Sequence, residues 1–151
     1  MKISFILIVT IMALLVPQGA PSAEDALLER SGIRYPEGFD LNTVHEIQGK
    51  VRGFTMPEQG PVSFSLSAKR ETYTVFASPR WYWDDLKVSL GEGAEVRVLG
   101  STTLGRDGHL YLVAQELTVL DSRKSYSFRA SDGTPLWRGP RIGSGGRGVG
   151  G

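Results

Sequence analysis

The chain has no cysteine. Disulfides, thiol catalysis, cysteine metal sites and a lipid-bearing cysteine behind a leader are therefore all excluded. Histidine is almost as scarce, because only His45 and His109 occur, and neither stands at a spacing typical of a metal or nucleophile motif. The sequence therefore predicts no catalytic residue, no metal ligand and no cofactor. A non-enzymatic protein follows from the missing acid–base constellation.

Net charge is also missing. Without Lys2, which belongs to a predicted leader, 16 basic residues balance 16 acidic ones. A neutral chain has no overall field that would attract a polyanion such as a nucleic acid.

Long hydrophobic runs are absent except at the N-terminus, where Ile3 to Val16 is almost wholly apolar behind Met1 and Lys2. Small and helix-breaking residues follow, and cleavage after Ala20 or Ala23 fits this layout. The run is shorter than the about 20 residues that a membrane span needs. We therefore expect residues 1–23 to be a cleaved signal peptide that leads to the bacterial periplasm, with no stable membrane span afterwards.

Five segments with the alternation of β-strands follow. From Val44, one face carries Ile47, Gly49, Val51 and Gly53. The other segments are Val62–Ala68, Thr72–Ala77, Ala94–Gly100 and His109–Leu120. In the last one the apolar phase slips, which predicts a bulge near Gln115 and Glu116.

A Pro-started aromatic cluster and a short helical crossover separate the third and fourth segments. Five strands with a crossover at this point predict an all-β, five-stranded Greek-key barrel of the OB type over residues 44–137. Residues 24–43 should form a helical turn at Glu24–Arg30 and an extended lead-in on the barrel. A terminal hairpin around Asp132-Gly133 and a disordered Gly- and Arg-rich tail, residues 138–151, should follow.

Several short motifs resemble a known family. They are Ala77-Ser78-Pro79-Arg80-Trp81-Tyr82, the run from Gly91 to Ser101, and Asp132-Gly133-Thr134-Pro135-Leu136-Trp137. Together these are similar to small exported bacterial OB-fold proteins, which include periplasmic stress proteins and magnetosome-associated proteins. The resemblance implies a binding module and supplies no ligand or site residue.

Trp81-Tyr82-Trp83 allows two interpretations. The three rings either close one end of the barrel, which we favour, or form a binding surface. For the second case the candidate ligand-binding residues are Arg52, Lys69, Arg70, Arg80, Trp81 and Tyr82.

The function predicted from these features is a periplasmic binding module for a protein partner or small ligand. A nucleic-acid or oligosaccharide binder is the first alternative, because OB barrels use aromatic stacking for such ligands. A metal-handling or redox accessory protein is the second.

Overall fold

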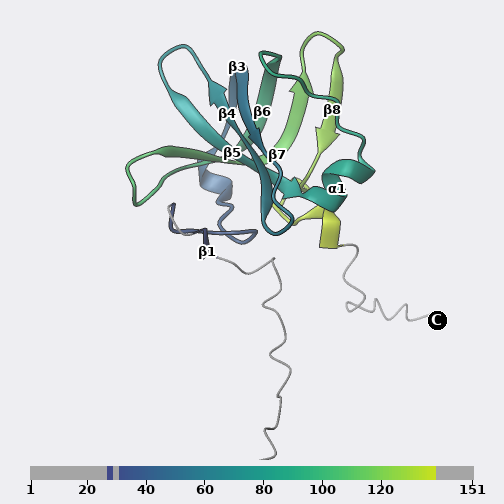
Figure 1. The fold of residues 1–151 in the computed structure, drawn as a ribbon. Coiled ribbons are helices and arrows are strands. Elements are labelled where there is room, and N and C mark those ends of the chain that lie inside the picture. The colour runs from purple at the N-terminus through teal and green to yellow at the C-terminus, as the bar shows by residue number, and fades with distance from the viewer. Residues whose placement is uncertain (1–26, 29–30, 139–151) are drawn as a thin grey trace, which may run out of the picture.

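The computed structural model describes residues 27–28 and 31–138, so the predicted leader and the tail beyond Arg138 lie outside the described residues (Figure 1). The described elements are β1 (Leu27–Leu28), β2 (Ile33–Arg34), the 3-10 helix η1 (Leu41–Thr43), β3 (Val44–Thr55), β4 (Pro61–Ser67), β5 (Thr72–Pro79), α1 (Arg80–Asp85), β6 (Glu95–Leu104), β7 (Leu110–Val119), β8 (Lys124–Ser127) and η2 (Leu136–Arg138).

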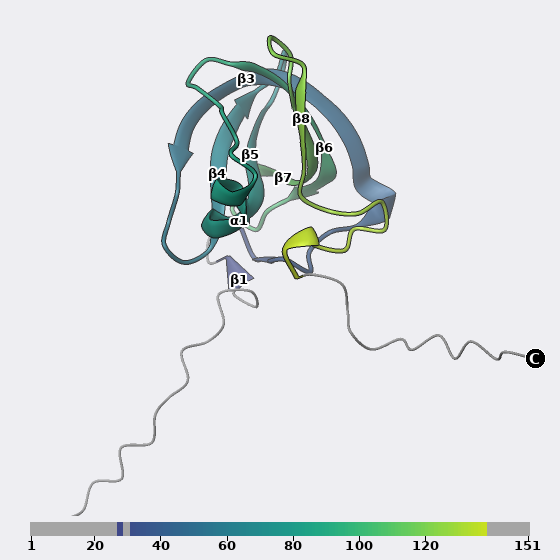
Figure 2. The same cartoon turned by 90° about the vertical axis from the view of Figure 1, so that its right-hand side faces the viewer.

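Strands β3 to β7 form a closed barrel. Their order is β5-β4-β3-β6-β7, and a parallel ladder between β5 and β7, from Tyr73↔Leu110 to Phe76↔Val113, closes the ring. The other ladders are antiparallel. Strand β3 is strongly curved, as Figure 2 shows. In the sequence, α1 lies between the third and fourth barrel strands, β5 and β6. The predicted fold class, a five-stranded OB-type barrel with a short helical crossover, is confirmed.

The barrel interior follows the alternation in the sequence. In β4, Val62, Phe64 and Leu66 are at most 2% exposed, while the serines between them face outward. Strand β5 is covered on both faces near its end. There the outward Phe76 is buried and stacks on Tyr111. Burial of such side chains supplies the main driving force for folding, at about 25 cal/mol per Å² of apolar surface.

The described ladders shift register at three places, and the third is at the start of β4, between Pro61 and Ser63. Between Leu99↔Glu116 and Gly100↔Ala114 the β6–β7 register skips Gln115, which confirms the predicted bulge. A second bulge skips Gly53 between Arg52 and Phe54. The expectation that Gly53 faces the interior is wrong. Gly53, whose φ is +50°, is the extra residue of the bulge in β3. The alternation of side chains shifts by one residue there, so Phe54 packs against Phe64.

The lead-in packs on the barrel from one end of β5 to the β6–β7 turn. Tyr35 Oη donates to the Ala77 carbonyl, and the Arg106 N–H donates to the Ser31 carbonyl. Tyr35 and Pro36 are buried. The helical turn expected over Glu24–Arg30 is not formed at Leu27–Leu28, which pair with β2 as a strand because Gly32, at φ +68°, reverses the chain behind them.

The C-terminal segment is more than the expected hairpin. Strand β8 pairs with β7 and extends the sheet by one strand. The turn at Asp132-Gly133 is flanked by the bridge between Arg129 and Pro135 and by hydrogen bonds from the Ala130 N–H to the Thr134 carbonyl and from the Leu136 N–H to the Phe128 carbonyl. The expected short hairpin is thus present, and η2 then carries Trp137 to the barrel.

Candidate functional site

The aromatic cluster is divided between core and surface. Trp83 is 5% exposed, stacks on Phe128 with ring centroids 5.9 Å apart, and meets Phe54 edge-on. Tyr82 is half-buried, donates through Oη to the Ser127 carbonyl at 3.3 Å, and contacts the Trp137 ring. Burial raises the pKa of the Tyr82 phenol. These two rings close one end of the barrel, as the favoured interpretation of the cluster predicts.

Trp81 belongs to the surface. It is 52% exposed and touches the edge of Tyr82. Its neighbour Arg80 forms an exposed ion pair with Asp84 at 3.8 Å, one helical turn further along α1. A surface pair of this kind contributes little stability, so it leaves the guanidinium available to a ligand.

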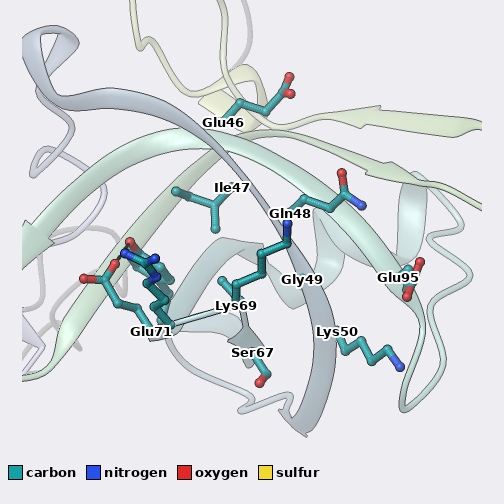
Figure 3. Close-up of a pocket in the computed structure, with 12 residues that line it drawn as sticks. Glu46, Ile47, Gln48, Gly49, Lys50, Ser67, Lys69, Glu71 and Glu95 are labelled. Atoms are coloured by element: carbon teal, nitrogen blue, oxygen red, sulfur yellow. Dashed lines mark hydrogen bonds between the residues drawn. The ribbon is translucent and has the colours of Figure 1, made fainter.

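A groove opens at the other end of β5. Its volume is about 820 Å³, against about 440 and 410 Å³ for two smaller hollows. We call it the β3 groove, because the first half of β3 forms one wall and the β4–β5 turn forms the other (Figure 3). Its lining residues are Glu46, Ile47, Gln48, Gly49, Lys50, Ser67, Ala68, Lys69, Arg70, Glu71, Tyr73 and Glu95.

The acids of the β3 groove are mostly engaged. Glu46 forms an ion pair with Arg97, with Nε and Oε1 3.2 Å apart. Tyr73 Oη donates to Glu71, and this hydrogen bond, aided by burial and by the Glu71 charge, raises the pKa of the Tyr73 phenol.

The cations of the β3 groove are not engaged. Lys50, Lys69 and Arg70 are exposed and form no ion pair with another described residue. Of the acids at the groove, Glu71 and Glu95 likewise form no ion pair with another described residue. The lining thus holds as many carboxylates as cations, but Lys69 and Arg70 concentrate positive charge on the β4–β5 turn.

The structure separates the six predicted ligand-binding residues into distinct places. Lys69 and Arg70 lie together on the β4–β5 turn and line the β3 groove. Arg80, Trp81 and Tyr82 lie on α1, at the opposite end of β5 (Figure 1). Arg52 is exposed on β3 beyond the groove, and it pairs with Ser65 of β4. The six residues therefore do not form one site.

Sequence reasoning missed the β3 wall of the groove, above all Ile47 and Gln48. One signal could have indicated it. The first strand segment is longer than the second, so part of the first strand must extend past its partner and leave an edge uncovered. Strand β3 has 12 residues and β4 has 7.

Among residues 27–28 and 31–138, no group of three or more His, Asp or Glu side chains is placed to hold a metal ion. His45 and His109 do not meet, since β3 pairs with β4 and β6 and His109 contacts Asp107 instead. No helix in the described part of the chain has the length and apolar character of a membrane span.

Ring order, parallel closure and the crossover helix together define an OB-fold barrel, the class of protein to which this chain belongs. More narrowly, the chain belongs to the MamS/MamX magnetosome protein family, whose model matches residues 43–123. The resemblance to magnetosome-associated proteins is thereby confirmed, while the link to exported stress proteins stays a prediction.

No curated protein matches the chain. Among solved structures, the mitochondrial single-stranded DNA binding protein Rim1 of S. cerevisiae is similar at 17% sequence identity and a TM-score of 0.42. The match covers 54% of this chain and 93% of Rim1.

Proposed function

We propose that this chain is an exported, non-enzymatic OB-fold module that binds a protein partner of the magnetosome in the β3 groove. The observation that carries the proposal is the groove itself. It combines an apolar floor, including Ile47 and Tyr73, with the unpaired cations Lys50, Lys69 and Arg70. A mixed apolar and charged surface of this kind suits a protein segment.

Export is supported by the N-terminal sequence. The apolar run from Ile3 to Val16 and the small residues before Glu24 have the layout of a secretory leader. A barrel of this size needs no disulfide in that compartment, because its core is large enough to hold the fold.

A protein partner is favoured over a nucleic acid by the distribution of aromatic rings. Single-strand binders stack successive bases on several exposed rings. In the described part of the chain, the large apolar side chains that are exposed include a single ring, Trp81, and it lies on α1, away from Lys69 and Arg70. Nucleic acid or oligosaccharide binding at α1 is therefore the second candidate.

Capture by the tagged full-length chain from its own cells tests the proposal. We expect wild type to retain a defined partner and the double charge reversal Lys69→Glu/Arg70→Glu to lose it. The control Arg80→Glu/Trp81→Ala, which reverses one charge and removes the exposed ring on α1, should retain it. Loss in the α1 variant with retention in the groove variant would move the site to α1. Single-stranded oligonucleotide binding at low salt would then be measured.

Export is tested on the same preparation. The N-terminus of the purified chain, read by mass spectrometry, should begin after Ala20 or Ala23. A chain isolated from the cytoplasm with Met1 to Val16 intact would overturn the exported part of the proposal.

A further inference from the structure

Half of β3 has a strand partner on one side only. Residues Val44–Lys50 pair with β6, from Val44↔Ser101 to Lys50↔Glu95. Pairing with β4 begins at Lys50↔Ser67 and continues toward Thr55. On the β4 side, Val44 to Gly49 thus have no ladder partner among the described residues, and the β3 groove lies along this edge.

The hydrogen bonds of Val51 show which way the N–H and carbonyl groups along this edge point. Its N–H donates to the Ala94 carbonyl at 2.9 Å, and its carbonyl accepts from the Gly93 N–H, so both groups face the β6 side. The β3–β6 register contains no shift. Alternation along the strand therefore directs the N–H and carbonyl groups of Gln48 and Glu46 away from β6, into the groove.

Strand β4 leaves β3 at a close contact. A Cβ on Gly49 would lie 2.5 Å from the Ser67 carbonyl oxygen, so only glycine allows the backbones to approach at this point. Beyond it the β4–β5 hairpin ends in its turn, where the Ala68 N–H donates to the Glu71 carbonyl. The hairpin is therefore too short to cover Gln48 and Glu46.

Side chains on both sides of the edge define what would fit there. Ile47 is half-buried and Tyr73 is buried, so they offer an apolar floor. In the view of Figure 3, Lys69 extends from the turn in the direction of Gln48. Lys69 and Arg70 have no acidic partner among the described residues. They complement a segment that carries carboxylates.

We propose that the partner binds by strand addition, as an extended acidic segment that pairs with β3 at Glu46 and Gln48. Its backbone bonds the unpaired groups of these two residues. Alternate side chains of the segment are apolar and lie over Ile47 and Tyr73, and the carboxylates between them meet Lys69 and Arg70. This inference deepens the proposed function and rests on it for the identity of the site.

Amide hydrogen exchange on the full-length chain tests the free edge. The Gln48 and Glu46 amides should exchange much faster than those of Ile47 and Gly49, which face β6. If Gln48 and Glu46 are as protected as their neighbours in the free protein, the edge is already occupied and the proposal is wrong.

A capped heptapeptide of alternating Val and Glu is the binding probe. We expect it to bind, to protect the Gln48 and Glu46 amides, and to bind more weakly as salt is raised. The same peptide with Lys in place of Glu should bind at least about tenfold more weakly, because it would face Lys69 and Arg70. Equal binding of the two peptides would contradict the acidic segment.

Gln48→Pro is the decisive variant. Proline removes the N–H that faces the groove and leaves the β6-facing groups of Ile47 and Gly49 intact, as proline on an edge strand does. Affinity for the Val–Glu peptide should fall at least about tenfold. A thermal unfolding curve checks that the variant is folded. If it is not, N-methylation of the peptide amides removes the hydrogen bonds that the peptide would donate to the Glu46 and Gln48 carbonyls, and it should weaken binding in the same way.

The two proposals can fail separately. If Gln48→Pro still captures the cellular partner while Lys69→Glu/Arg70→Glu loses it, strand addition is wrong and the proposed function stands. If neither variant affects capture, the groove is not the site and both proposals fall.

Discussion

The barrel is packed differently at the two ends of β5. At the α1 end, Trp83 stacks on Phe128 and meets Phe54 edge-on, and these rings close the barrel. At the other end, Gly49 and Ser67 meet backbone to backbone and the turn beyond them carries Lys69 and Arg70. The rings leave a hollow of about 440 Å³ beside Phe54 and Trp83, whereas the small residues and charged side chains at the other end leave the larger β3 groove. The packed rings thus lie at one end of β5, and the groove proposed for binding lies at the other.

Trp83→Ala should have the largest effect. Removing a ring that is 5% exposed and stacked on Phe128 should lower the free energy of unfolding by about 3–5 kcal/mol. Urea denaturation measures it. Trp81→Ala is the matched control, because that ring is 52% exposed, and it should change the value by less than about 0.5 kcal/mol. If the two variants lower the free energy of unfolding equally, Trp83 does not close the barrel any more than the exposed Trp81 does.

Arg129→Ala should come next. The Arg129 guanidinium is 3% exposed, lies 5.2 Å from the Phe39 and Trp137 ring centroids, and donates to the Gly133 carbonyl at 3.0 Å. Its Nε and Nη2 atoms have no hydrogen-bond partner in the described part of the chain, and burial lowers its pKa to about 10. Deleting the side chain should cost about 2–4 kcal/mol through lost packing and cation–π contacts.

Arg129→Met separates volume from charge. Methionine fills most of the space without a buried charge that no carboxylate compensates, so the cost should be below about 1.5 kcal/mol in the same urea experiment. A cost equal to that of alanine would show that the guanidinium itself fastens the lead-in and η2 to the closed end.

Gly49→Val tests the groove end. The added Cβ would meet the Ser67 carbonyl at 2.5 Å and force β3 from β4, at about 1–3 kcal/mol. Gly91→Ala is the control, since nothing lies within 4 Å of its Cβ position, and should stay within about 0.5 kcal/mol. Thermal unfolding compares them. A neutral Gly49→Val would mean that the end of β4 moves freely.

The smallest expected effect is the contribution of Asp107 to stability at low pH. The hydrogen bond from Tyr111, with smaller contributions from His109, lowers the pKa of Asp107 in the β6–β7 turn to about 2. The folded pKa lies below the ordinary value of 3.8, so the contribution of Asp107 to stability is complete above that value and is lost as the pH falls toward 2.

Melting temperatures of wild type and Asp107→Asn between pH 6 and pH 2 check this. Wild type should be slightly more stable at the upper end, and the difference should vanish at the lower end. Tyr111→Phe, which removes the donor, should abolish the same pH dependence. A difference that persists at pH 2 would assign the role of Asp107 to packing instead of charge.

The barrel could be predicted from the sequence because Val62, Phe64 and Leu66 alternate with serines and because the slip before Leu117 marks a bulge. The division of Trp81-Tyr82-Trp83 could not, since three adjacent rings on one helical turn give no sign of which faces inward. The groove was missed for a related reason. In the sequence, Lys69 and Arg70 resemble the charged residues of any turn. The β3–β4 and β3–β6 pairings are needed to show that Gln48 lies on the edge of β3 that β4 leaves uncovered.

The parallel ladder between β5 and β7 has a consequence for how the chain folds. The β4–β5 and β6–β7 hairpins join neighbouring segments, whereas Tyr73 and Leu110 are separated by the helix and all of β6. Contacts between distant parts of a sequence form slowly, so we expect ring closure to come late. Until then β5 and β7 also display free edges and compete with β3 for any extended chain nearby. The strand addition proposed at β3 therefore becomes selective only when the last ladder has formed.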